Sequence, residues 1–219
     1  MLQNSELQYI VVEGVIGAGK SSLAHMISRK LQARLFLEQF EENPFLGGFY
    51  KDRKRFAFQT QMFFLVNRYK QQQQIAQDTL FENYTVSDYL FAKDKIFAYL
   101  NLSSDELKLY EALFPLLEKQ VRKPDLVVYL RSSTERLLYN IKQRNREIES
   151  NISADYIKEL SEHYDQFFFR YQNTPLLIVN TTEIDFVNNK NDFEELFNAI
   201  FRKDRGFTEY YKPEARKKK

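Results

Sequence analysis

The segment Gly14-Val-Ile-Gly-Ala-Gly-Lys-Ser21 fits the pattern G-x-x-x-x-G-K-[ST] and is the most informative stretch of the chain. An apolar run typical of a buried strand, residues 9–13, precedes it, and a helical pattern follows it. In this context the glycines let backbone N–H groups surround phosphates, and the N-terminus of the helix adds partial positive charge. The stretch therefore predicts a phosphate-binding loop, whose residues are Gly14, Val15, Ile16, Gly17, Ala18, Gly19, Lys20, Ser21 and Ser22.

Lys20 and Ser21 carry the chemistry expected of such a loop. Lys20 should reach the β- and γ-oxygens of ATP, and Ser21 should supply a ligand to Mg²⁺. The alternative interpretation is a glycine-rich turn between a strand and a helix, with an ordinary surface lysine. By itself the loop does not distinguish an ATPase, a GTPase and a small-molecule kinase.

Two further patterns bear on that choice. Asn189-Lys-Asn-Asp192 spells the N-K-x-D motif with which GTPases recognise guanine, but a helical pattern follows it and no strand ends there. We therefore interpret this match as chance. The chain also lacks an obvious strand of four aliphatic residues ending in Asp-Glu, which argues against a motor ATPase.

Four more apolar runs, at residues 35–38, 84–88, 126–130 and 176–180, alternate with helical patterns. This βαβ rhythm predicts a doubly wound α/β fold of the P-loop NTPase type, with a five-stranded parallel sheet flanked by helices. We expect one domain over residues 1–205 and a charged C-terminal tail over residues 206–219, which ends in Arg-Lys-Lys-Lys.

The composition narrows the class of partner. Basic and acidic residues nearly balance, 32 against 30, so no broad field for a polyanion is expected and nucleic acid is an unlikely partner. The absence of cysteine excludes a disulfide framework and a thiol nucleophile, and fits a reducing compartment. No apolar run approaches the ~20 residues of a membrane span. We therefore expect a cytoplasmic protein that does not bind membranes.

Several ordered blocks of sequence make the chain recognisable. They are Glu13-Gly-Val-Ile-Gly-Ala-Gly-Lys-Ser21, Glu41-Glu-Asn-Pro-Phe-Leu-Gly-Gly-Phe-Tyr50, Phe56-Ala-Phe-Gln-Thr-Gln-Met-Phe-Phe-Leu-Val-Asn-Arg68, Ser87-Asp-Tyr-Leu-Phe-Ala-Lys93 and Asp185-Phe-Val-Asn-Asn-Lys-Asn-Asp-Phe193. With these blocks the chain resembles the deoxynucleoside kinase family from about residue 9 to residue 200, and in particular the bacterial deoxyguanosine and deoxyadenosine kinases. The resemblance implies ATP- and Mg²⁺-dependent 5′-phosphorylation of a small-molecule deoxynucleoside, with a purine expected, in nucleotide salvage by a homodimer.

The resemblance also implies roles for residues that would face the sugar. Glu38, after the second strand, would be the general base that accepts the proton of the 5′-hydroxyl. Gln39 stands where the family usually has proline. Tyr50 and Glu149 would bind the 3′-hydroxyl and so select a deoxyribose. The alternative for this pair is a packed tyrosine and a glutamate at a helix end.

For the base, the resemblance implies that Gln61 and Asp88 form a polar pair on its edge, with Arg68 holding the aspartate. Gln59 is the alternative if the register is shifted. An amide offers a donor and an acceptor side by side, whereas we would expect a carboxylate at position 61 in a bacterial deoxyguanosine kinase. This favours adenine or broad specificity, and the preferred base stays open.

The remaining expectations concern the phosphates. Arg144 and Arg146 would clamp the transferring phosphoryl group from a lid, in which Asn145 replaces the glycine of the family's Arg-Gly-Arg and Asn140 stands where arginine is common. The alternative is a solvated basic helix end. Residues assigned only by resemblance are Glu82 near Mg²⁺, and Asp185 and Phe186 in an adenine-binding loop.

Two other functions compete with this one. A nucleoside monophosphate kinase of the thymidylate kinase type would need a basic cluster for the phosphate of its acceptor, whereas residues 38–48 are acidic. A non-catalytic ATP-binding protein would have no need of Lys20, Ser21 and Glu38 together.

Overall fold

The computed structural model describes residues 7–78 and 84–213. Within them the chain forms a parallel sheet of six strands in the order β2-β3-β1-β4-β5-β6. Because all of these strands run in the same direction, their carboxyl ends meet at one edge of the sheet, where ligands of such folds bind. The strands are β1 (Tyr9–Gly14), β2 (Arg34–Phe36), β3 (Thr85–Ser87), β4 (Leu126–Arg131), β5 (Leu176–Asn180) and β6 (Thr208–Tyr211).

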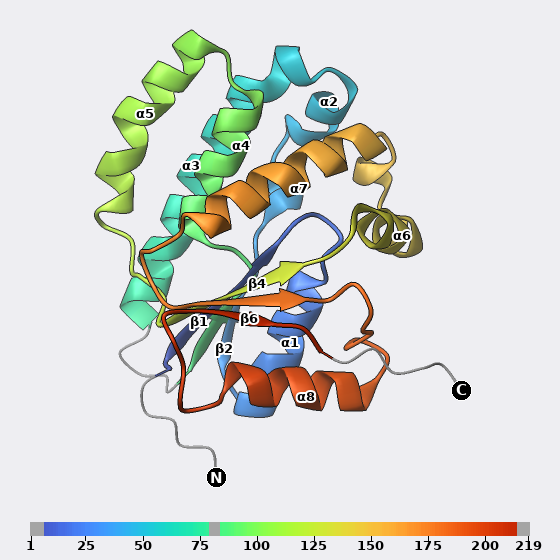
Figure 1. Ribbon diagram of the computed structural model, residues 1–219. Coiled ribbons are helices and arrows are strands. Elements are labelled where there is room, and N and C mark those ends of the chain that lie inside the picture. Colours follow the sequence, from blue (N-terminus) through green and yellow to red (C-terminus); the bar gives the residue numbers. More distant parts are fainter. Residues whose placement is uncertain (1–6, 79–83, 214–219) are drawn as a thin grey trace.

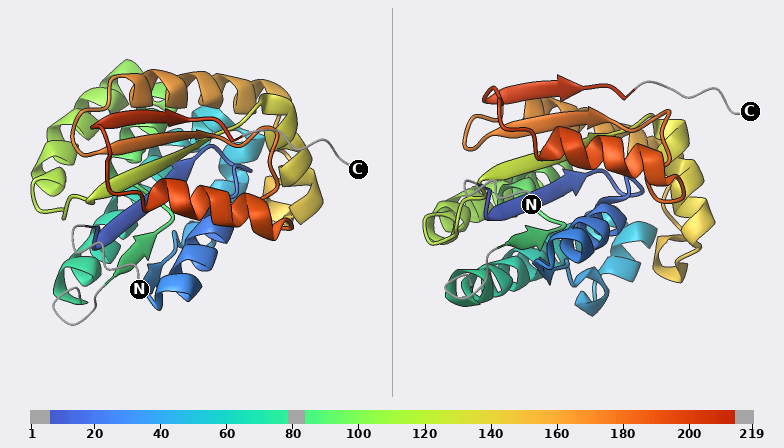
Figure 2. Two further views of the ribbon diagram at one scale, coloured as in Figure 1. Left: turned by 60° about the horizontal axis from the view of Figure 1, so that its bottom comes forward. Right: turned by 90° about the horizontal axis from the view of Figure 1, so that it is seen from below.

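Helices cover both faces of this sheet. In Figure 1 two of them, α1 and α8, lie below it, and α3, α4 and α7 lie above it, with α5 outside α3 and α4. The two turned views in Figure 2 agree with this three-layer arrangement. The helices are α1 (Lys20–Leu31), α2 (Leu46–Lys51), α3 (Arg53–Asp78), α4 (Asp94–Asn101), α5 (Ser104–Glu118), α6 (Thr134–Arg144), α7 (Ala154–Phe169) and α8 (Lys190–Ile200), with 3₁₀ turns η1 (Phe40–Glu42), η2 (Phe91–Lys93) and η3 (Glu147–Glu149).

The central strands are buried along almost their whole length, which explains their continuous apolar sequences. β1 pairs with β3 on one side and with β4 on the other, so the direction in which the chain adds strands reverses beside β1. A crevice opens at such a reversal, outside the carboxyl ends of the strands. The phosphate-binding loop follows β1 and therefore lies at this crevice.

The predicted doubly wound α/β fold is confirmed, but the predicted number of strands is wrong by one. The sixth strand, β6, pairs with β5 from Leu176↔Thr208 to Val179↔Tyr211. This strand falls in the segment expected to be a charged tail. It was not predicted because its sequence, Thr-Glu-Tyr-Tyr, contains no apolar run. Its residues alternate in exposure, as is common in an edge strand. Residues 214–219, the rest of that segment, lie outside the described residues.

Local signals set the helix boundaries. Ser103 and Glu106 form a capping box at the start of α5. The hydroxyl of Ser133 accepts the N–H of Arg136 and caps α6, the helix that leads to the predicted lid. In the described part of the chain, no helix has the length and apolarity needed to cross a membrane.

Candidate active site

The phosphate-binding loop is held in one shape by its glycines. Gly17 and Gly19 have φ angles of +88° and +89°, in the left-handed region that glycine adopts at low cost. A Cβ atom at Gly17 would lie 2.6 Å from the carbonyl oxygen of Leu137 on α6, and one at Gly19 would lie 2.7 Å from the ring of Phe186. The N-cap of α1 is Gly19, which has no side chain to cap the helix, so the first N–H groups of α1 stay available to an anion.

Lys20 and Ser21 lie at the mouth of this loop. The ammonium of Lys20 donates to the carbonyl oxygen of Val15 at 3.3 Å, and the hydroxyl of Ser21 donates to Oδ2 of Asp88. Burial, and after it repulsion from the charge of Lys93, lower the pKa of Lys20 to about 8. The anionic oxygens of a nucleotide are the ligand that would favour its charged form.

Glu38, just after β2, lies beside the loop and between two cations. Its Oε1 accepts Nε of Arg68 at 2.7 Å, and its Oε2 accepts Nζ of Lys93 at 2.7 Å. Burial alone would raise the pKa of this carboxyl, but the charges of Arg68 and Lys93 outweigh burial and lower it to about 2. Glu38 and Lys20 line the same cavity, so the predicted base faces the loop that would hold ATP.

Asp88 lines the same cavity as Gln61 but does not form the predicted pair with it. It follows β3, next to β1, so its side chain lies at the phosphate-binding loop. Its Oδ2 accepts the hydroxyl of Ser21, and its Oδ1 accepts the N–H of Glu38 at 2.7 Å. Arg68, predicted to hold Asp88, instead binds Glu38 and Asp94. Asp88 and Ser21 thus form a pair of oxygen ligands of the kind that Mg²⁺ prefers.

Asp94, the first residue of α4, takes the place that the sequence analysis gave to Asp88. The amide nitrogen of Gln61 donates to its carbonyl oxygen at 3.0 Å and to its Oδ1 at 2.5 Å, and Arg68 binds its Oδ2. Gln61 is buried and lines the cavity, whereas Gln59 is exposed, so the alternative register is wrong. The block of sequence used for the resemblance ended at Lys93, one residue before Asp94.

Tyr50 of α2 and Glu149 of η3 line the same cavity as Glu38. The ring of Tyr50 packs edge to face on Tyr156 at a centroid distance of 6.5 Å, and burial raises its pKa well above the usual value. Glu149 is only 8% exposed. The structure therefore brings the two residues predicted to face the 3′-hydroxyl to one cavity wall.

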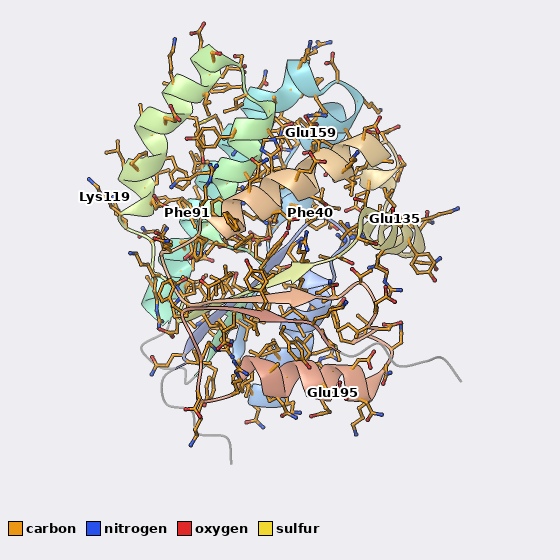
Figure 3. All side chains as sticks on the ribbon, viewed as in Figure 1. Phe40, Phe91, Lys119, Glu135, Glu159 and Glu195 are labelled. Atoms are coloured by element: carbon orange, nitrogen blue, oxygen red, sulfur yellow. The ribbon has the colours of Figure 1, made fainter. Side chains whose placement is uncertain are left out.

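The two arginines of the predicted lid also line this cavity. Nε of Arg144 donates to Glu149 at 2.8 Å, and the guanidinium of Arg146 stacks over the ring of Phe40 at 4.6 Å. Figure 3 labels Phe40, which in this view lies between α7 and the end of the sheet. Between the arginines, Asn145 ends α6 with a φ of +47°, a conformation in which asparagine replaces glycine at small cost.

A second cavity, of about 480 Å³, adjoins the loop on the side away from Glu38. It lies between α6 and the segment after β5, where the ring of Phe186 packs on Gly19 and the carboxylate of Asp185 accepts two N–H groups of Asn188. The cavity lined by Glu38 is smaller, about 100 Å³, so side chains must move when a nucleoside enters.

The N-K-x-D match has a structural role. The side chain of Asn189 accepts the N–H of Asn191 and caps α8, and Asp192 accepts the N–H of Asp185 at 2.8 Å. Glu82, proposed near Mg²⁺ from the resemblance, lies outside the described residues. Besides Asp94, Lys93 and the buried Glu13 were not predicted, since only the folded chain brings Lys93 to Glu38 and Glu13 to Lys93.

The fold and this site define a class of enzyme that transfers a phosphoryl group from a nucleotide to an acceptor beside a carboxylate. Residues 10–203 match the family model for deoxynucleoside kinases, and the chain belongs to that family. It is therefore a phosphotransferase that acts on deoxynucleosides.

Named relatives agree with this assignment. The chain is 36% identical to a deoxyguanosine kinase of Bacillus subtilis, over 86% of this chain and 93% of the relative. It is 33% identical to a deoxyadenosine kinase of Lactobacillus acidophilus, over 90% and 96% of the two chains. The structure of deoxyadenosine kinase from M. mycoides with bound dATP superposes with a TM-score of 0.77 at 30% identity, and covers 88% of this chain and 98% of that one.

Proposed function

We propose that this enzyme transfers the γ-phosphate of ATP to the 5′-hydroxyl of a purine deoxynucleoside, with Glu38 as the general base. One observation carries the proposal: Glu38 lies in a single cavity with Lys20 and Ser21 of the phosphate-binding loop and with Tyr50 and Glu149. A phosphate donor and a hydroxyl acceptor would thus meet beside one carboxylate.

The donor side would hold ATP with Mg²⁺. Lys20 would contact the β- and γ-oxygens, and the loop after β5, with Asp185 and Phe186, would take the adenine. Ser21 and Asp88 supply hard oxygen ligands, and two of them suffice because Mg²⁺ keeps waters and phosphate oxygens as its other ligands. When bound, this ion would neutralise charge that develops on the phosphates.

In the proposed reaction the 5′-oxygen bonds to the γ-phosphorus while the bond from that phosphorus to the β,γ-bridging oxygen breaks. The proton of the 5′-hydroxyl passes to Glu38, and the products are ADP and a deoxynucleoside 5′-monophosphate. A carboxylate with a pKa of about 2 is a weak base, which suits a loose transition state in which the hydroxyl loses its proton late. Arg144 and Arg146 would turn from Glu149 and Phe40 to the transferring group.

The base side of the cavity would present acceptors. Both hydrogens of the Gln61 amide point to Asp94, and the guanidinium of Arg68 is occupied by Glu38 and Asp94, which leaves Oε1 of Gln61 for the base. Such an edge favours a base with an exocyclic amino group, which adenine, guanine and cytosine have and thymine lacks. Relatives named for deoxyguanosine and for deoxyadenosine support a purine.

Steady-state kinetics on the four deoxynucleosides and on adenosine test this proposal. We expect deoxyadenosine and deoxyguanosine to have the highest kcat/KM, because a site built around specific polar groups rejects ligands that leave those groups unpaired. Adenosine should be poor, since Tyr50 and Glu149 would crowd its 2′-hydroxyl. Equal turnover of thymidine, which carries no amino group, would contradict the base assignment.

The remaining proposals concern the setting of the enzyme. We propose a cytoplasmic homodimer that acts in nucleotide salvage and does not bind nucleic acid, in keeping with a net charge of only +2. Exposed aromatic rings on two adjoining helices, Tyr99 of α4 at 53% and Phe169 of α7 at 81%, support a subunit contact. Sedimentation of the purified protein measures its mass in solution, and a monomer would contradict the dimer.

A further inference from the structure

Glu13 is a completely buried carboxylate at the end of β1, directly before the phosphate-binding loop. Its Oε1 accepts the N–H of Gly14 at 2.9 Å and the hydroxyl of Tyr164 at 3.3 Å, and its Oε2 accepts the N–H of Leu90 at 2.8 Å. These partners come from the loop, from α7 and from the segment after β3. Glu13 takes no direct part in the phosphoryl transfer proposed for Lys20 and Glu38.

Lys93 lies between this carboxylate and the base. Its ammonium is 3.7 Å from Oε2 of Glu13 and 2.7 Å from Oε2 of Glu38, and its side chain is 2% exposed. A buried ammonium has no water to stabilise its charge, so the two carboxylates decide where it rests. Lys93 therefore bridges the end of β1 to the end of β2.

A second ammonium, that of the half-buried Lys20, lies close enough to Lys93 for the two charges to repel each other. Burial raises the pKa of Glu13, and the attraction of Lys93 and of Lys20 works against that rise and favours its charged form. Without the negative charge of Glu13, the cations of Lys93 and Lys20 would face each other with less compensation, and Lys93 would be pushed away from its place beside Glu38.

We infer that Glu13 is a positioning residue that holds Lys93 against Glu38 and thereby fixes the oxygen that accepts the 5′-proton. Glu13 lines no part of the cavity and would touch neither the nucleoside nor the phosphates. The inference rests on the proposed role of Glu38 as the base. A role confined to the backbone N–H groups of Gly14 and Leu90 would make Glu13 structural only.

The substitution Glu13→Gln removes the charge and keeps the shape. We expect kcat to fall about 10- to 100-fold, because displacement of a catalytic group by a fraction of a bond length has effects of this size. KM for the deoxynucleoside should change little, since Gln61, Asp94 and Tyr50 are untouched. A merely structural defect would instead reduce the fraction of folded enzyme and leave kcat per folded molecule alone.

The substitution Glu13→Gln made in a Lys93→Met variant tests whether Glu13 acts on Glu38 through Lys93. If Glu13 acts through Lys93, Glu13→Gln should change kcat of Lys93→Met by less than about threefold, whereas independent effects would multiply. Glu209→Gln is the matched control. It also removes a carboxylate that forms ion pairs, here with Arg202 and Arg205, but Glu209 lies on β6 at the far edge of the sheet. This control should lower the melting temperature without a change in kcat.

Two outcomes would overturn the inference: a wild-type kcat in folded Glu13→Gln, or a full additional loss on top of Lys93→Met. Should Glu13→Gln not fold, Glu13→Asp keeps the charge but withdraws it from Lys93 by one methylene, and an unchanged kcat there would have the same meaning. Failure of the proposed function is distinguishable, because the wild-type enzyme would then form no deoxynucleoside monophosphate at all.

Discussion

Lys20 and Glu38 face one cavity, but their surroundings favour the charged form of only one of them. Burial and the charge of Lys93 lower the pKa of Lys20 to about 8, whereas Arg68 and Lys93 overcome burial and lower that of Glu38 to about 2. Glu38 therefore stays ionised at every pH at which the enzyme would be assayed, including mildly acidic pH. Lys20 is the group that titrates near neutral pH in the free enzyme.

This difference predicts the alkaline side of the pH profile. As pH rises through about 8, Lys20 loses its proton and its attraction for phosphate, so kcat/KM for ATP should fall up to tenfold per pH unit. At saturating ATP the bound phosphates stabilise the ammonium, and kcat should hold to higher pH. Initial rates against ATP concentration across this range measure both quantities. A flat kcat/KM well above pH 8 would contradict the assignment.

The role of Glu38 as a base predicts that Glu38→Gln lowers kcat by roughly 10²- to 10⁴-fold, the span typical of a positioned base, while deoxynucleoside binding persists. Single-turnover rates and equilibrium binding separate the two effects. Glu42→Gln, at an exposed residue of η1, is the matched control and should leave the rate unchanged. A small effect of Glu38→Gln on kcat would mean that Glu38 is an ordinary loop residue and not the general base.

Residues of the site were predictable from sequence where a motif fixes their place in space. The phosphate-binding loop is such a motif, because strand, loop and helix are consecutive. Asp88 was misplaced, since its position in the sequence does not tell whether it faces Ser21 or Gln61. Asp94 depends on how α4 packs against α3, a contact between distant segments that no local pattern encodes.

At the scale of elements, α6 links the loop to the lid through Asn140. Its side-chain amide donates to the carbonyl oxygen of Gly17 at 2.9 Å, at the place where the loop approaches Leu137 most closely. The residue that stands where the family often has arginine therefore holds the lid helix against the phosphate-binding loop.

The contact predicts a defect on the donor side. Asn140→Ala should raise KM for ATP about 2- to 10-fold, the value of one hydrogen bond, with little change in KM for the deoxynucleoside. Lys142→Ala, at an exposed residue of the same helix, is the control. An equal rise in both KM values would mean that α6 acts on the whole site and not through the loop.

Strands could be predicted from the sequence where their burial produces a simple pattern of apolar residues. The strands β1, β4 and β5 are buried on both faces and appear as apolar runs. The edge strand β6 has an alternating sequence and a solvated side, so the sequence alone resembled a tail.

For the whole molecule, the order of strands gathers the site. β2, β3 and β1 are neighbours, and their carboxyl ends carry Glu38, Asp88 and the phosphate-binding loop to one crevice. The fold class could be predicted from the alternation of strands and helices along the chain. The buried series of charged residues Glu13, Lys93, Glu38 and Arg68 could not be predicted, because its members come from four separate segments.

The most direct test of the central claim is to identify the product formed from ATP and deoxyadenosine or deoxyguanosine. We expect the deoxynucleoside 5′-monophosphate and ADP in equal amounts, and the loss of both in Lys20→Ala with an unchanged melting curve. Absence of the monophosphate, or conversion of a monophosphate to a diphosphate instead, would contradict the proposed phosphorylation of deoxynucleosides.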